Sequence, residues 1–175
     1  KLSKKIDNST LALAKKNGFG DAHIAYLSGK DEDEIRKMRK KIGLIPGYLM
    51  VDTCAGEFQA STPYFYSAHD DEGDKIEKGK SVLILGSGPI RIGQGIEFDY
   101  STVHGVQAVR NMDLEAVVIN NNPETVSTDF DASDRLYFEP LEKEEVLDII
   151  DVEKPYGIIL QLGGQTAVNL ASDIA

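Results

Sequence analysis

A glycine-rich loop directly after a short apolar segment constrains the fold of this chain more than any other feature. Residues 81–85 (Ser-Val-Leu-Ile-Leu) are apolar after the first position, and residues 86–95 contain four glycines. An apolar run of this length that ends at glycines is typical of a buried parallel strand followed by a turn. Because a helical pattern follows at 97–112, the region predicts the strand, loop and helix that open a βαβ unit.

The order of the later elements predicts an α/β domain. Further apolar runs at 116–119, 136–138 and 158–162 are expected as strands, and 141–152 and the segment from residue 165 as helices. Strands that alternate with helices form a parallel sheet with helices on both faces. We therefore expect a Rossmann-like parallel sheet over residues 81–175.

The residues before this sheet predict a small helical domain. Residues 10–16, 22–27 and 31–42 are the expected helices, and Asp21 can cap the second of them. The third has acidic residues in its first turn and basic residues in its last, which complements the helix dipole. We assign residues 1–68 to this helical domain and the charged residues 69–80 to a linker.

Charge and composition exclude several classes of partner. The net charge is −10, although residues 1–42 carry 11 Lys and Arg against 6 Asp and Glu. An acidic surface argues against non-specific nucleic-acid binding, and no apolar run approaches the length of a membrane span. The single cysteine, Cys54, excludes an internal disulfide and fits a reducing compartment. We expect a cytoplasmic protein that binds neither nucleic acid nor membranes.

Two other classes fit parts of the chain and are kept as alternatives. A free-standing Rossmann-type nucleotide-binding module would place a third glycine where Arg91 stands, and an acidic residue where residues 120–122 are all Asn. A helix-turn-helix DNA-binding regulator would use residues 21–43. The second helix of that motif begins with four acidic residues at 31–34, which would repel phosphates.

Three polar loops follow the expected strands, at residues 86–96, 120–129 and 163–166. Ligands of parallel sheets gather at the carboxyl ends of the strands, so these loops are the candidate site. Their charged members include Arg91, Glu97 and Glu124. The polar side chains can line a cavity, or they can simply satisfy the backbone of the loops.

The residues alone assign no catalytic, cofactor or metal site. No arrangement of a nucleophile and a base is found. Four aspartates could bind a metal, but their spacing fixes no coordination geometry: Asp99, Asp129, Asp131 and Asp134.

Four contiguous motifs are far longer and more specific than the three glycines of a dinucleotide-binding loop. They are Gly-Ser-Gly-Pro-Ile-Arg-Ile-Gly-Gln-Gly-Ile-Glu-Phe-Asp-Tyr at 86–100, Asn-Asn-Pro-Glu-Thr-Val-Ser-Thr-Asp at 121–129, Ser-Asp-Arg-Leu-Tyr-Phe-Glu-Pro at 133–140 and Gly-Gly-Gln-Thr at 163–166. Together they resemble the large subunit of carbamoyl-phosphate synthase. Parts of the helical region resemble the end of that family's oligomerisation domain.

The resemblance implies an ATP-dependent carbon–nitrogen ligase that hydrolyses glutamine and makes carbamoyl phosphate for pyrimidine and arginine synthesis. Each of its two halves holds a pre-ATP-grasp domain and then an ATP-grasp domain. Since oligomerisation-like sequence precedes residue 81, the resemblance implies the pre-ATP-grasp domain of the second, carbamoyl-phosphate half, truncated at its C-terminus.

The resemblance also implies where the cofactors and partners lie. ATP and Mg or Mn would bind downstream in the ATP-grasp domain, so the fragment itself would hold no cofactor and be inactive. Its partners would be the rest of the large subunit and the small glutamine amidotransferase subunit, with possible oligomerisation.

The resemblance further implies a tunnel that carries carbamate between the halves. Matching the motifs places Arg91, Gly95, Glu97 and Glu124 on the tunnel wall. Carbamate is an unstable anion that needs exclusion from water, and a glycine at position 95 would leave the bore open. The alternative for Arg91 is a structural ion pair with Glu97 or Glu124.

Overall fold

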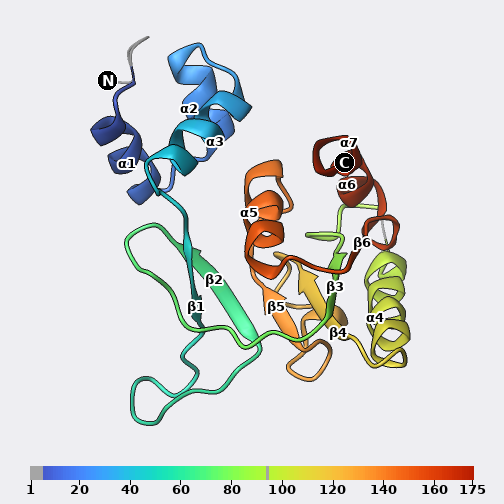
Figure 1. Ribbon diagram of the computed structural model, residues 1–175. Helices are drawn as coiled ribbons and strands as arrows, with labels where there is room; N and C mark the ends of the chain where they lie inside the picture. The colour runs from blue at the N-terminus through green and yellow to red at the C-terminus, as the bar shows by residue number, and fades with distance from the viewer. Residues whose placement is uncertain (1–5, 94) are drawn as a thin grey trace. The chain divides into compact units, whose positions relative to one another are not determined.

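The computed structural model describes residues 6–93 and 95–175, which form two compact units (Figure 1). The first contains the described residues up to Tyr48 together with Ser67–Asp74. The second contains Leu49–Tyr66 and Lys75–Ala175. The chain therefore passes from one unit to the other three times.

Three short helices build the first unit: α1 (Asn8–Lys16), α2 (Asp21–Ser28) and α3 (Glu32–Lys41). The apolar side chains of Leu11, Ile24 and Ile35 are fully buried between them. The first turn of α3 is fixed by a capping box, in which Asp31 and Glu34 satisfy each other's backbone N–H groups. The three predicted helices are confirmed, with small changes at their ends.

A buried ionic cluster lies within these helices. The Arg39 guanidinium is 0% exposed and donates through Nε to both carboxylate oxygens of Asp21, at 3.1 and 3.0 Å. Lys15 Nζ lies 3.4 Å from the same carboxylate. The N-cap of α2 is Gly20, so the prediction that Asp21 caps this helix is wrong. The Asp21 side chain instead pairs with Arg39, 18 positions further along the chain.

A six-stranded sheet has the strand order β1-β2-β5-β4-β3-β6. Pairing is parallel between β2 and β5, β5 and β4, β4 and β3, and β3 and β6. The strands are β1 (Gly47–Met50), β2 (Tyr64–Ala68), β3 (Ser81–Leu85), β4 (Glu115–Ile119), β5 (Arg135–Tyr137) and β6 (Gly157–Ile159). The α/β fold class with a mostly parallel sheet is confirmed.

Strands β1 and β2 were not predicted, because residues 1–68 were expected to be helical. The helices end at Lys41, and two strands follow within residues 47–68. In β2, Tyr64 and Phe65 pair with Leu136 and Tyr137 of β5. Aromatic residues favour strands, but a strand this short leaves a weak periodic pattern in the sequence.

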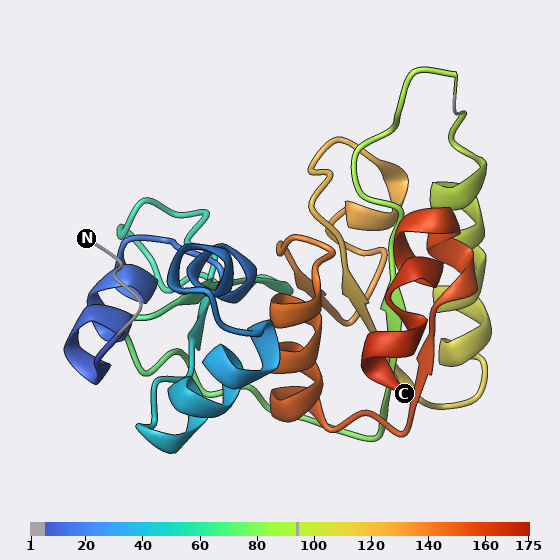
Figure 2. The same cartoon turned by 90° about the horizontal axis from the view of Figure 1, so that it is seen from above.

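The core of the second unit is formed by β3 and β4 with α4 (Glu97–Arg110). Every residue of β3 is buried, as a central parallel strand requires. Figure 2 shows α4 and α5 (Lys143–Glu153) on opposite faces of the sheet. The chain then forms α6 (Gly164–Asn169) and α7 (Ala171–Ile174). Among the described residues, no helix has the length and apolar character needed to cross a lipid bilayer.

Candidate functional site

The three predicted loops leave the carboxyl ends of β3, β4 and β6, and two of them pack backbone against backbone. A methyl group at Gly163 would collide with the carbonyl oxygens of Leu85 and Gly86. Gly86 in turn donates its N–H to the carbonyl of Ile119 at 2.9 Å. Glycine is required at position 163 because only a hydrogen atom fits against the β3 loop.

A cavity of about 330 Å³ lies at this edge of the sheet. Its walls are the start of the glycine-rich loop (residues 87–91), Asn121 after β4, residues 140–142 before α5, and Thr166 of α6. Arg91 Nη2 donates to Thr166 Oγ1 at 3.4 Å, which links the loop after β3 to α6. The carboxyl edge therefore forms a recess with both polar and apolar walls, at the place where parallel sheets bind ligands.

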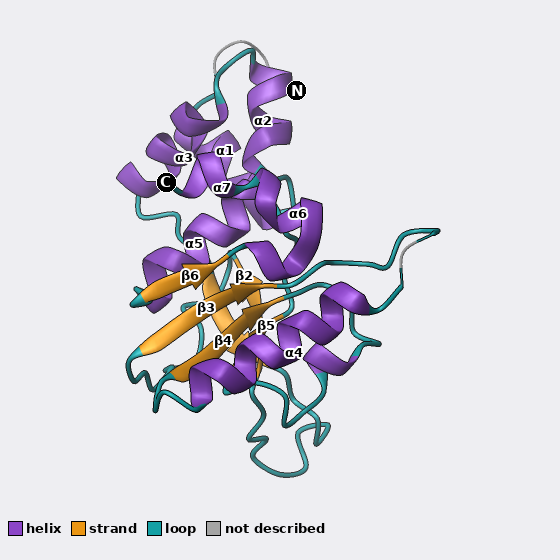
Figure 3. Ribbon diagram, turned by 90° about the vertical axis from the view of Figure 1, so that its right-hand side faces the viewer, coloured by secondary structure: helices purple, strands orange, loops and turns teal. Residues whose placement is uncertain are grey.

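The structure places the four predicted site residues on two segments, the one that leads from β3 into α4 and the loop after β4. Arg91 lines the cavity, and Glu97 is the first residue of α4. A side chain at Gly95 would meet the Glu97 carboxylate, with its Cβ 2.5 Å from Oε2. Glu124 lies on the loop after β4, where its N–H donates to Asn122 Oδ1 at 3.1 Å. All four residues are exposed, and Figure 3 shows the loop between β3 and α4 extending away from the sheet.

Three buried polar residues join these segments through contacts that were not predicted from the sequence. Asn120 is fully buried, accepts from the Gly88 N–H through Oδ1 at 3.0 Å, and donates through Nδ2 to Ser127 Oγ at 3.3 Å. Asp99 accepts from the Ser127 N–H at 3.2 and 3.3 Å. Asn120 and Asn122 thus accept hydrogen bonds from the backbone of the loops. This is the role that the sequence offered as the alternative to lining a cavity. The sequence offers one signal for Asn120, which is an amide side chain directly after a buried apolar strand.

Asp99 was also one of four aspartates considered as metal ligands. Its two oxygens both accept from the backbone of Ser127. Within residues 6–93 and 95–175, no three His, Cys, Asp or Glu side chains are grouped closely enough to hold a metal ion. The observed role of Asp99 is to join the first turn of α4 to the segment after β4.

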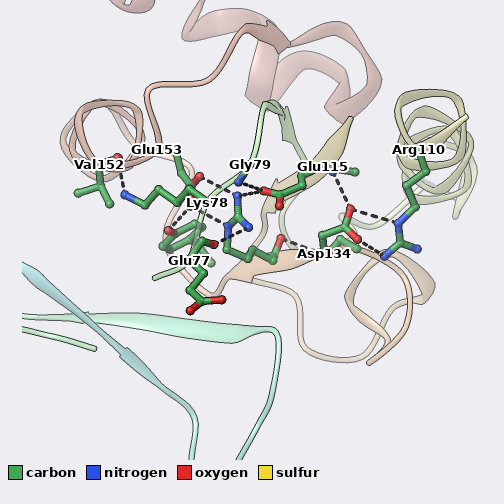
Figure 4. A network of polar contacts seen from close by, with 12 residues as sticks. Glu77, Lys78, Gly79, Arg110, Glu115, Asp134, Val152 and Glu153 are labelled. Atoms are coloured by element: carbon green, nitrogen blue, oxygen red, sulfur yellow. Dashed lines mark hydrogen bonds and ion pairs between the residues drawn. The ribbon is translucent and has the colours of Figure 1, made fainter. Parts of the chain in front are cut away.

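The third motif, residues 133–140, begins at the amino end of β5 and runs along that strand to the cavity wall at residue 140. Arg135 donates to Glu153 at 3.0 and 3.1 Å and to Glu115 at 2.7 Å, and Glu153 also accepts from the Tyr137 hydroxyl (Figure 4). Burial alone would lower the pKa of Arg135, but these carboxylates outweigh it and raise that pKa. Arg135, the first residue of β5, therefore stabilises the end of the sheet remote from the cavity.

Asp134 in the same motif joins α4 to the sheet. It pairs with Arg110 at 3.0 Å and accepts from the Ala116 N–H at 2.7 Å. Burial alone would raise the pKa of Asp134, but the hydrogen bonds from Arg110 and Ala116 hold it below its usual value. Asp134 is thus a structural carboxylate.

A carboxyl group in the first turn of α5 has a strongly shifted pKa. Burial raises the pKa of Glu145 from 4.5 to about 7, its own backbone N–H opposes the shift, and the charges of Glu144, Glu142 and Glu139 add to it. Its Oε2 atom is buried with no hydrogen-bond partner. The folded state therefore binds this proton more tightly than the unfolded state.

We expect Glu145→Gln to stabilise the second unit above pH 7 by ~1–2 kcal/mol, allowing for partial exposure of the group. Because the pKa is raised on folding, the parent chain loses stability as pH rises from 4.5 to about 7. The difference between the two proteins should vanish below pH 4.5, where Glu145 is protonated in both states. Denaturant unfolding across this range measures it, and identical pH profiles would contradict the assignment.

Two family models match the chain. Residues 78–175, more than half of the chain, match the carbamoyl phosphate synthase preATP-grasp domain. Residues 1–43 match the oligomerisation domain of the carbamoyl-phosphate synthetase large chain. The first match agrees with the resemblance of the four motifs, and the second with that of the helical region. Strands β3 to β6 lie within the residues that the first model matches. The chain therefore belongs to the carbamoyl-phosphate synthase large-chain family.

Proposed function

We propose that this chain is part of the large subunit of a glutamine-hydrolysing carbamoyl-phosphate synthase. That enzyme makes carbamoyl phosphate from bicarbonate, glutamine-derived ammonia and two ATP, for pyrimidine and arginine synthesis in the cytoplasm. The observation that carries the proposal is the order of the two matches, with oligomerisation sequence before the pre-ATP-grasp domain. This order supports a place at the start of the carbamoyl-phosphate half.

We place the ATP and Mg or Mn sites in an ATP-grasp domain outside these residues, as the family resemblance implies. The chain itself then acts as scaffold and as tunnel wall. The rest of the large subunit and the small amidotransferase subunit are its proposed partners. The oligomerisation-domain match supports association of the helical region with the large subunit or with further copies.

The proposed tunnel wall consists of Arg91, Gly95, Glu97 and Glu124. Because these residues are exposed on two loops of the carboxyl edge, an enclosed path needs a second wall from another part of the enzyme. The loop between β3 and α4 exposes the apolar side chains of Ile90, Ile92 and Ile96, which suit contact with a second wall. Arg91 would offer a positive charge to the carbamate anion.

The proposal predicts that Gly95→Phe in the complete enzyme blocks carbamate transfer. A Cβ at position 95 would lie 2.5 Å from Glu97 Oε2, so the ring and the displaced carboxylate would both enter the path. We expect carbamoyl phosphate formation to fall by about ten-fold or more, since small displacements in such sites have large kinetic effects. Bicarbonate-dependent ATP hydrolysis should continue, because it occurs in the other half.

Gly95→Ala provides the graded control for this experiment. Its methyl group meets only the far end of the flexible Glu97 side chain, which can move aside. We expect a smaller loss of carbamoyl phosphate formation than with phenylalanine. Unchanged carbamoyl phosphate output in Gly95→Phe would refute the tunnel assignment.

A further inference from the structure

We propose that Asn120, Ser127 and Asp99 form a loop clamp that sets the relative position of the two loops carrying the proposed tunnel residues. All three would be positioning residues for carbamate transfer. This inference rests on the proposed function, since it concerns the same loops. It adds three residues to which neither the motifs nor the family matches give a role.

The loop clamp holds the glycine-rich loop at both of its ends. At the start of that loop the Gly88 N–H donates to Asn120, and just beyond its end Asp99 accepts from Ser127. Both partners belong to the segment after β4, in which Asn120 and Ser127 are themselves joined at 3.3 Å. The four residues therefore close a circuit that passes through both loops.

The proposed tunnel residues all lie between these anchor points. Three of them, Arg91, Gly95 and Glu97, fall between Gly88 and Asp99 in the sequence. The fourth, Glu124, falls between Asn120 and Ser127. Any shift at the anchors would move all four residues, although none of the four takes part in the clamp bonds themselves.

Burial makes the loop clamp difficult to replace by water. Asn120 is 0%, Ser127 1% and Asp99 3% exposed, so losing one partner leaves the others without solvent. A Cβ at Gly86 would lie 2.6 Å from the Asn120 Cγ atom, which shows how tightly the amide is enclosed. By contrast, Ile92 at the tip of the loop is fully exposed. The loop is thus fixed at its base.

Hydrogen exchange of the large subunit tests whether the clamp exists. In Asn120→Ala, peptides covering Gly88 should exchange about ten-fold faster, because the buried Gly88 N–H loses its acceptor. Asn111→Ala, an exposed asparagine at the other end of α4, is the matched control and should leave these peptides unchanged. Unaltered exchange in Asn120→Ala would overturn the proposal.

The ratio of ATP hydrolysed to carbamoyl phosphate formed tests the positioning role. In Asn120→Ala and in Asp99→Ala we expect this ratio to rise several-fold, because misplaced loops release carbamate to water. Asp99→Asn keeps an oxygen for the Ser127 N–H and should restore the parental ratio, whereas a merely structural defect would lower all rates together. If Asn120→Ala fails to fold, Ser127→Ala removes only one bond and should give a smaller rise.

The outcomes separate this inference from the proposed function. Faster exchange with an unchanged ratio would overturn the positioning role. It would leave the proposed function standing, provided that Gly95→Phe still blocks carbamate transfer. Faster exchange together with a raised ratio and rescue by Asp99→Asn supports the clamp.

Discussion

Replacing Asp21 with alanine is expected to lower the free energy of unfolding of the helical unit by about 3–5 kcal/mol. Arg39 is 0% exposed and pairs with both oxygens of Asp21, while Lys15, 4% exposed, contacts the same carboxylate. Removing that carboxylate leaves two buried cations without the charge that both contact. Water cannot compensate, because the site is closed to solvent.

Hydrogen exchange of the amides of α2 and α3 measures this loss in the helical unit alone. Asp31→Ala is the matched control, because Asp31 is an exposed aspartate that caps α3 and should contribute only about 1 kcal/mol. The triple variant Asp21→Leu, Arg39→Met and Lys15→Met removes all three charges of the cluster and should recover much of the stability. If Asp21→Ala lowers the free energy of unfolding no more than Asp31→Ala does, the Asp21–Arg39 pair is not a main source of stability.

The second large effect is expected for Glu153→Ala in the sheet unit, again about 3–5 kcal/mol. The carboxylate of Glu153 accepts two hydrogen bonds from Arg135 and one from Tyr137, and it is only 5% exposed. Alanine leaves the Arg135 guanidinium buried with Glu115 as its remaining carboxylate partner. Tyr137, which is fully buried, loses the hydrogen bond that its hydroxyl group donates to Glu153 at the same time.

Exchange of the β3 and β4 amides, together with thermal unfolding, measures this effect. Glu153→Gln keeps an acceptor oxygen but removes the charge, so we expect an intermediate loss of about 1.5–3 kcal/mol. Glu142→Ala, an exposed glutamate directly before α5, should change stability by less than about 0.5 kcal/mol. If Glu153→Gln were as stable as the parent chain, the charge of Glu153 would not matter at this position.

The sheet unit could largely be predicted from the sequence because its signals are local. The apolar runs of β3 and β4 and the glycines after β3 mark strands and a turn within a few residues of each other. Strands β1 and β2 were not predicted. Strand β2 pairs with β5, which lies some 70 residues further along the chain, and β1 joins the sheet only through β2. Local pattern reveals elements, but it does not reveal which short segments pair.

The same limit applies to individual polar residues. Asp21 stands where a helix begins, so a local argument makes it a cap, whereas the fold brings Arg39 to it. The loops of the candidate site were found from their position after the strands. The bond from Ser127 to Asp99 spans 28 positions, so no motif spacing could indicate it. Long-range partners of buried polar groups are decided by tertiary packing.

The three passages of the chain between the two units have a consequence for how this protein can be divided. Residues 49–66 belong to the sheet unit but stand between two segments of the helical unit, residues 6–48 and 67–74. A single cut at any of the three passages would divide at least one unit between the two fragments. Neither unit can therefore be expressed intact as one uninterrupted stretch of sequence without residues of the other unit. A gene truncation within residues 49–66 would divide both units. Recombination between relatives would preserve both units only if it exchanged the entire interlaced region.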